Sequence, residues 1–158
     1  MAQNNEPDYF DSYTGIKNHS QSLSGWYPAV HETRLRLNYT YYNSKEIMER
    51  IFNWYAKIDP DGRLFDYTVI DDGSQDVPIT ECDIPDWWTV LRIEEDLGWN
   101  NEGARNCLMR DTQNEWNLMM DSDWVITKRC LHRITRELVF LAKDTVYFPG
   151  NFGPKVGR

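Results

Sequence analysis

Two short groups of aspartates stand out because their type and spacing could hold a metal ion. Asp71 and Asp72 directly follow an apolar run, and Asp121 and Asp123 directly follow another. Carboxylate oxygens are hard ligands that suit Mg²⁺ or Mn²⁺. Such an ion needs only one or two protein carboxylates when phosphate oxygens complete its shell, and it can neutralise a departing diphosphate. The pattern therefore indicates metal-assisted binding of a phosphate-bearing ligand.

Each aspartate group also has a plainer interpretation. Asp and Gly are common turn formers, and a chain with 25 acidic residues often carries Asp-x-Asp in a solvated loop. The segment 71–76 does not follow the calcium-loop pattern, which needs ligands at every second position and a later Glu. The chain has neither GxGxxG nor GxxxxGK[ST], so dehydrogenase and P-loop sites have no support.

The elements that must position these aspartates alternate between strand and helix. Hydrophobic periodicity predicts strands at about 35–41, 64–70, 88–93 and 116–120, with a short strand-like segment at 145–148. Helices are predicted at 45–57, after Asn100 and around 131–141. This order favours an α/β fold with a mostly parallel sheet and helices on both faces. Parallel strands place their carboxyl ends at one edge, so the two aspartate groups should meet there.

Bulk properties narrow the function classes. A net charge of −8 argues against a nucleic-acid partner. No apolar run approaches the ~20 residues of a membrane span, and no signal peptide is visible. Cys82, Cys107 and Cys130 are widely spaced, and we expect buried or half-buried free thiols in a reducing compartment. We therefore expect a cytoplasmic protein with an irregular arm at 1–33 and one domain at 34–158.

Four segments in this order resemble the family 2 glycosyltransferases of the GT-A fold. They are Tyr39–Asn43, Val69–Asp76, Gly103–Asn106 and Met120–Asp123, and the resemblance spans about residues 34 to 145. It implies a Rossmann-like three-layer fold. It also implies transfer of a sugar from a nucleoside diphosphate donor, with a leaning to UDP, to a carbohydrate or other hydroxyl acceptor, assisted by Mn²⁺ or Mg²⁺.

The resemblance assigns roles to matching positions on the base side. Thr40 and Tyr42 look like the first-strand residues that line the nucleobase pocket. Asp71 looks like the aspartate that accepts a hydrogen bond from the base, with Asp72 nearby.

On the phosphate side, Arg105 and Asn106 look like the helix residues beside the donor. Arg105 could face a phosphate or pair with a neighbouring acid. Asp121 and Asp123 look like the Asp-x-Asp pair, with Asp123 in direct contact with the metal and Asp121 facing ribose or metal.

The second half of such a domain is shortened in this sequence. Inverting members use a carboxylate well after the Asp-x-Asp as general base, but only 35 residues follow Asp123. Of the acids among them, Glu137 fits a solvated helix position and Asp144 carries no further signal, so no base is assigned. His132 fits a surface helix position. We expect the nucleotide-binding part of a transferase, either a fragment or a small member that borrows its acceptor side from a partner subunit through an unfinished sheet edge, as in a homo-oligomer.

Three other functions remain open from the sequence. The domain could bind a nucleotide sugar without catalysing transfer. Exposed members of its seven tryptophans could form a carbohydrate-binding surface. A phospho-acceptor receiver domain also gathers acids at strand ends, but its Lys and Thr landmarks at later strands are missing.

Overall fold

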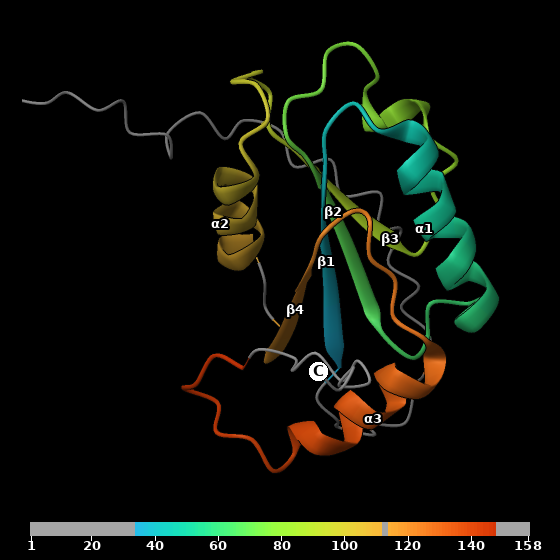
Figure 1. Cartoon of the computed structure of the whole chain (residues 1–158), viewed down its shortest axis with the longest axis vertical. Coiled ribbons are helices and arrows are strands. Elements are labelled where there is room, and N and C mark those ends of the chain that lie inside the picture. Colours follow the sequence, from blue (N-terminus) through green and yellow to red (C-terminus); the bar gives the residue numbers. More distant parts are fainter. Residues whose placement is uncertain (1–33, 112–113, 148–158) are drawn as a thin grey trace, which may run out of the picture.

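A four-stranded parallel sheet forms the centre of the fold, in the order β3-β2-β1-β4 (Figure 1). The computed structural model describes residues 34–111 and 114–147, so the predicted arm at 1–33 lies outside the described residues. The strands are β1 (Leu35–Tyr41), β2 (Asp66–Asp71), β3 (Trp88–Arg92) and β4 (Trp116–Met120). The other elements are α1 (Lys45–Ile58), α2 (Asn101–Asp111), α3 (Lys128–Leu138) and the 3₁₀ turn η1 (Ile79–Glu81). The predicted α/β fold with a parallel sheet is confirmed.

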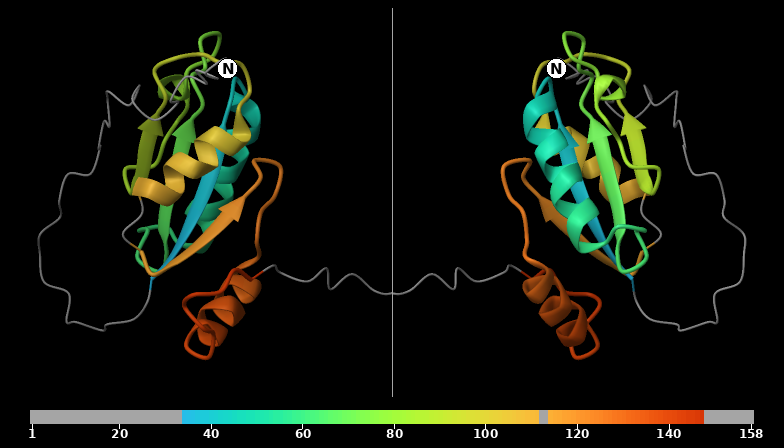
Figure 2. Two further views of the ribbon diagram at one scale, coloured as in Figure 1. Left: turned by 90° about the vertical axis from the view of Figure 1, so that its left-hand side faces the viewer. Right: turned by 90° about the vertical axis from the view of Figure 1, so that its right-hand side faces the viewer.

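Helices cover both faces of the sheet, as predicted. Figure 2 shows α1 on one side of the strands and α2 on the other. Leu37 and Tyr39 of β1 belong to the same buried cluster as Met48 and Phe52 of α1. The opposite face packs α2 against residues of β2 and β3, through Ile70, Leu91, Ala104, Cys107 and Leu108. All seven residues of β1 are consequently buried, although the strand alternates apolar and polar side chains.

The polar side chains of β1 are buried with partners. Arg36 donates to Thr68 Oγ1 at 2.6 Å and lies 3.3 Å from Asp111 Oδ2 at the end of α2. Asn38 donates to Asn117 Oδ1 at 3.2 Å. Because most buried polar groups are hydrogen-bonded, these contacts let the α2 side of the strand carry polar residues, although Asn38 Oδ1 itself has no partner among the described residues.

Aromatic rings fill the core beneath α1. Trp88 is 2% exposed, and its ring lies edge-on to Phe52 with centroids 4.7 Å apart. Trp87 is half-buried and packs against the same core. The Trp87–Trp88 pair therefore does not form an exposed carbohydrate-binding surface.

Helix α3 lies at the opposite edge of the sheet from the carboxyl ends of the strands (Figures 1 and 2). Thr127 caps its first turn, because its hydroxyl accepts a hydrogen bond from the Cys130 backbone N–H at 3.3 Å. Leu131 and Leu138 join the main core. Leu141, predicted to share this helix, lies beyond its end but still packs against the core.

The predicted strand at 145–148 is wrong for residues 145–147, which form turn and irregular structure. The local composition favours a strand, but no strand of the described part pairs with the segment. Tyr147 instead packs its ring near Trp116 and accepts a hydrogen bond from the Ala142 backbone at 2.9 Å. Residue 148 lies outside the described part of the chain.

Two further predictions concern thiols and membrane spans. Cys82 and Cys107 are buried free thiols, and Cys130 is an exposed one. Within the residues that the structure describes, every helix is too short or too polar to cross a membrane.

Candidate functional site

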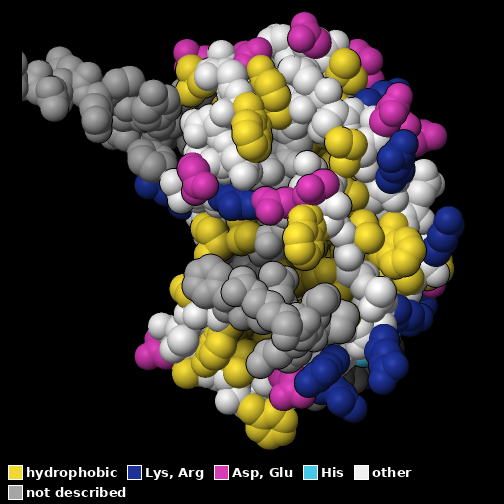
Figure 3. All heavy atoms as spheres, in the orientation of Figure 1, with side chains coloured by type: hydrophobic (Ala, Val, Ile, Leu, Met, Phe, Trp, Pro, Cys, Tyr) yellow, Lys and Arg dark blue, Asp and Glu magenta, His cyan; other side chains and the backbone are white. Residues whose placement is uncertain are grey.

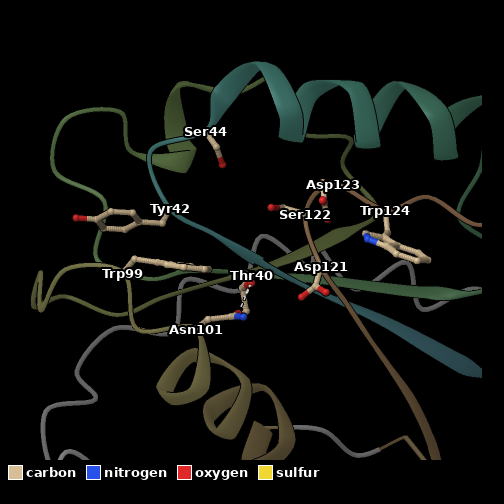
Figure 4. Close-up of a pocket in the computed structure, with 9 residues that line it drawn as sticks. All are labelled: Thr40, Tyr42, Ser44, Trp99, Asn101, Asp121, Ser122, Asp123 and Trp124. Carbon is tan, nitrogen blue, oxygen red and sulfur yellow. Dashed lines mark hydrogen bonds between the residues drawn. The ribbon is translucent and has the colours of Figure 1, made fainter. Parts of the chain in front are cut away.

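A pocket of about 630 Å³ opens at the carboxyl ends of β1 and β4 (Figure 4). Its walls come from the end of β1, the start of α1, the loop before α2 and the segment after β4. The lining residues are Thr40, Tyr42, Ser44, Trp99, Asn101, Asp121, Ser122, Asp123 and Trp124. Tyr39 of β1 pairs in register with Met120 of β4, so the next residues of both strands reach the edge together. The parallel register therefore brings Thr40 and Tyr42 to the Asp-x-Asp segment.

The end of β1 holds the loop that precedes α2. Thr40 Oγ1 donates to Asn101 Oδ1 at 2.8 Å, and Tyr42 Oη donates to Asp96 Oδ1 at 3.2 Å. Between these two tethers the loop carries Trp99, whose side chain is 73% exposed and lines the pocket. Thr40 and Tyr42, the two residues predicted to line a nucleobase pocket, thus hold the loop that places the exposed Trp99 indole in the pocket wall.

Asp71 lies behind the pocket rather than in its lining. Its carboxylate has no exposed surface and accepts hydrogen bonds from the backbone N–H groups of Ser74 at 2.9 Å and Ile79 at 3.0 Å. Arg92 of β3 pairs with it at 2.8 Å. Asp71 therefore holds the loop that follows β2, and its predicted contact with a base stays a prediction.

Asp72 is also buried, and it holds the loop that precedes α2. It is 3% exposed and accepts a hydrogen bond from the Asn100 backbone N–H at 2.6 Å, next to Trp99. Burial raises the pKa of the Asp72 carboxyl to about 6. The negative charges of Asp71 and Asp96 also raise this pKa, whereas the hydrogen bond from Asn100 lowers it.

The raised pKa of Asp72 predicts a specific pH dependence of stability. The unfolded carboxyl has a pKa of about 3.9, so between about pH 4 and about pH 6 the folded state binds this proton more tightly. Asp72 therefore lowers the free energy of unfolding as pH rises through that window. Asp72→Asn keeps an acceptor for Asn100 and removes the titration. We expect urea unfolding to show the variant gaining stability relative to the parent chain from pH 4 to pH 7; parallel curves would contradict this.

Gly73 allows the loop after β2 to pack against the loop before α2. Its φ is +74°, in the region that favours glycine. A Cβ at this position would overlap the carbonyl oxygen of Glu95 and approach the Cα of Asp96. A side chain here would push apart two loops that Asp72 joins.

Asp121 and Asp123 differ in what surrounds them. Both are exposed on the turn after β4, which is closed by a hydrogen bond from Trp124 N to Asp121 O at 3.0 Å. Asp121 forms an ion pair with Arg105 of α2. Among residues 34–111 and 114–147, no Lys, Arg or His pairs with Asp123. Asp123 is therefore the carboxylate of the pair that is open to a cation.

The donor set fits a divalent cation only in part. No group of three or more His, Cys, Asp or Glu in the described ranges is placed to hold a metal ion. Two carboxylates at the pocket wall are nevertheless what Mg²⁺ or Mn²⁺ needs from a protein when phosphate oxygens and water supply the other ligands. The residues present thus fit a cation that binds together with a phosphate-bearing ligand.

Of the two α2 residues predicted to lie beside a donor, Arg105 and Asn106, only Arg105 reaches the pocket. Arg105 reaches the pocket edge through its ion pair with Asp121, which is the alternative weighed for it from the sequence. Asn106 is exposed and is not among the lining residues. The structure therefore connects Arg105 to the pocket, and the role of Asn106 beside a ligand stays a prediction.

Sequence reasoning missed several residues of the pocket wall. They are Ser44, Trp99, Asn101, Ser122 and Trp124. Ser122 was available as the middle residue of Asp-x-Asp, and Asn101 opens a helix that was predicted. Trp99 gives a signal only in three dimensions, since its exposure is what distinguishes it from the buried Trp88.

The family model described as Glycosyl transferase family 2 matches residues 40–151, which is more than two thirds of the chain. The chain belongs to glycosyl transferase family 2. The resemblance stated from its motifs is thereby confirmed. A comparison with curated protein sequences gives no match.

Solved structures of TarS share this fold over part of their length. The crystal structure of S. aureus TarS 1-349 is 22% identical with a TM-score of 0.54, covering 68% of this chain and 32% of that one. TarS 1-349 in complex with UDP-GlcNAc is 24% identical with the same TM-score, covering 68% and 31%. The mannosyltransferase PcManGT from Pyrobaculum calidifontis, in complex with GDP-Man and Mn²⁺, gives a TM-score of 0.45 at 20% identity over 60% and 28%. The chain thus spans about a third or less of each of these structures. The TarS likeness shows that this family 2 domain has part of the GT-A fold.

Proposed function

We propose that this family 2 domain binds a nucleoside diphosphate sugar, with UDP favoured, as the donor side of a transferase that moves the sugar to a hydroxyl acceptor. One observation carries the proposal. A pocket at the carboxyl edge of the sheet has Tyr42 and Trp99 at one end, and Asp121 and Asp123 at the other beside Trp124 (Figure 4). A nucleotide sugar has the same order of chemistry, from a flat base to a charged diphosphate. Family membership supports the reaction class.

The pocket suggests how such a donor would lie. In Figure 4, Tyr42 and Trp99 lie toward one end of the pocket, and Asp121, Ser122 and Asp123 lie beyond Thr40 toward the other. A base would stack on the exposed Trp99, since base–aromatic stacking works for any base. The diphosphate would then reach the turn after β4.

Asp121 and Asp123 would have different roles beside the diphosphate. Arg105 already occupies Asp121, so Asp123 would make the direct contact with a divalent cation and Asp121 would assist or face the ribose. The cation would neutralise charge on the departing diphosphate. Arg105 would hold the Asp121 side chain in place beside it.

A second candidate function is binding without transfer. The only carboxylates among the described residues that line the pocket are Asp121 and Asp123, and both are assigned to the cation and ribose. No described carboxylate of the pocket remains to activate an acceptor hydroxyl. The nucleotide-binding module therefore stays in competition with the complete enzyme.

Calorimetric titration separates these functions. UDP, UDP-GlcNAc and GDP-mannose are titrated into the chain with Mn²⁺ and again with EDTA. We expect binding of a uridine nucleotide that is strongest with Mn²⁺. Release of free UDP from bound UDP-sugar would favour the enzyme, and its absence would favour the binding module. No binding of any nucleotide under either condition would contradict both.

Trp99→Ala should weaken nucleotide binding in the same titration. Stacking on an aromatic side chain contributes about 1–3 kcal/mol, so we expect Kd to rise about 5- to 150-fold. Leu97→Ala is the matched control, because Leu97 is an exposed apolar residue of the same loop outside the lining. An unchanged Kd for Trp99→Ala would exclude stacking at this end.

A further inference from the structure

The outward side of α3 carries a dense group of basic side chains in an acidic protein. Five exposed side chains share this side, which we call the basic face of α3: Lys128, Arg129, His132, Arg133 and Arg136. At helical spacing Arg129, His132, Arg133 and Arg136 lie away from Leu131 and Leu138, which anchor the helix to the core, and Lys128 flanks them at the start of the helix. Glu137 is the one acid within the helix, whereas the whole chain has a net charge of −8. Helix α3 thus carries a net positive charge in an acidic chain.

The basic face of α3 is hollowed and open to a large partner. Arg129, His132, Arg133 and Arg136 line a depression of about 550 Å³. Figure 3 shows Lys and Arg side chains gathered over the region of α3. Among the described residues, Lys128, Arg129 and Arg136 form no ion pair with a carboxylate. Their charges are therefore available to an anionic surface.

Two large apolar residues continue this face at the end of the helix. Val139 is 69% exposed and Phe140 is 83% exposed. A soluble polyanion without bases, such as polyphosphate, would use the cations but would gain nothing from an exposed phenylalanine, and the net charge of −8 argues against a nucleic acid. A bilayer offers anionic headgroups with an apolar layer directly beneath, and it matches both features.

We propose that the basic face of α3, together with Val139 and Phe140, is a peripheral docking surface for a bilayer that contains anionic lipids. The cations contact the headgroups, and Phe140 enters the boundary between headgroups and acyl chains. Helix α3 lies at the edge of the sheet opposite the pocket, so docking leaves the pocket open to solution (Figure 1). This inference does not depend on what the pocket binds.

Co-sedimentation of the full chain with unilamellar vesicles tests the surface. Vesicles of phosphatidylcholine are compared with vesicles that also contain phosphatidylglycerol. We expect binding only with the anionic lipid, weakening as salt rises. Arg129→Glu with Arg136→Glu should lower the partition coefficient by about tenfold or more. Equal binding to the two kinds of vesicle would overturn the proposal.

A matched charge reversal separates a local surface from a general charge effect. Lys45 and Arg50 are solvent-accessible cations in the first half of α1, whereas it is the last turns of α1 that approach α3. Lys45→Glu with Arg50→Glu changes the net charge equally and should leave the partition coefficient within about twofold, because contacts beyond a Debye length are screened. An equal loss in both double variants would contradict the proposal. Arg129→Gln with Arg136→Gln replaces the reversal if that variant fails to fold.

Phe140→Ser distinguishes a bilayer from a soluble polyanion. We expect this variant to bind anionic vesicles several-fold more weakly and to leave binding of inorganic polyphosphate unchanged. Full retention of vesicle binding by Phe140→Ser, with polyphosphate binding lost on charge reversal of α3, would assign the basic face to a soluble polyanion and overturn the proposal.

Discussion

Asp71→Ala should lower the free energy of unfolding by about 3–5 kcal/mol, the typical effect of removing one partner from a buried ion pair. The Asp71 carboxylate has no exposed surface, and its loss would leave the Arg92 charge without its carboxylate partner at 2.8 Å, with the Ser74 carbonyl still accepting from Nη2. Two backbone N–H groups, of Ser74 and Ile79, would also lose their acceptor. Since domains of this size are stable by only about 5–15 kcal/mol, urea unfolding will show a large shift of the midpoint.

Asp61→Ala is the control for this stability measurement. Asp61 pairs with Arg63 at 3.5 Å, and both side chains are about two thirds exposed. Exposed pairs contribute at most about 1 kcal/mol, so the midpoint should move little. If Asp71→Ala shifted the midpoint no more than Asp61→Ala, Asp71 would not be the acceptor that holds the loop after β2.

Asp123→Ala should remove the metal-dependent part of nucleotide binding. Asp123 is the open carboxylate of the turn after β4, and it would be the direct ligand of the cation. Loss of a direct ligand should weaken binding with Mn²⁺ by at least about 100-fold, since even supporting residues of metal sites contribute 10- to 100-fold. Binding measured with EDTA should be unchanged, because the base end of the pocket is untouched.

Two variants make the Asp123 measurement specific. Asp76→Ala removes an exposed acid outside the pocket lining and should leave binding with Mn²⁺ unchanged. Arg105→Ala frees Asp121 from its ion pair and should alter the metal dependence without abolishing it. If Asp123→Ala bound UDP as tightly as the parent chain with Mn²⁺, the cation would not be held at this turn.

Much of the fold followed from periodicity. The spacing of Ile47, Met48, Ile51, Phe52 and Tyr55 predicts one apolar helix face. The last four are the buried residues of α1, whereas Ile47 is 40% exposed. Parallel pairing also followed, because alternating strands and helices imply it, whereas the strand order came only from the structure. Periodicity failed at 145–147, since a short β-like run becomes a strand only when a neighbouring strand pairs with it.

The position of the site in the fold could be predicted from the sequence, but most of the contacts of its side chains could not. Apolar runs that end in aspartates identified the carboxyl edge, and the register of β1 with β4 explains why Thr40 meets the Asp-x-Asp turn. Sequence could not show that Asp71 turns into the loop toward Arg92 while Asp123 stays open. Only the tertiary structure decides which of these carboxylates is paired with an arginine, because sequence spacing does not show which way each side chain points.

Paramagnetic broadening by Mn²⁺ tests the central claim most directly. NMR spectra of the isotope-labelled chain are recorded with UDP and Mg²⁺, and then with substoichiometric Mn²⁺. We predict that amide signals of 40–44, 99–101 and 121–124 broaden when UDP is present, while signals of α3 stay sharp. Broadening centred elsewhere, or none when UDP and Mn²⁺ are both present, would contradict a donor site at the carboxyl ends of β1 and β4.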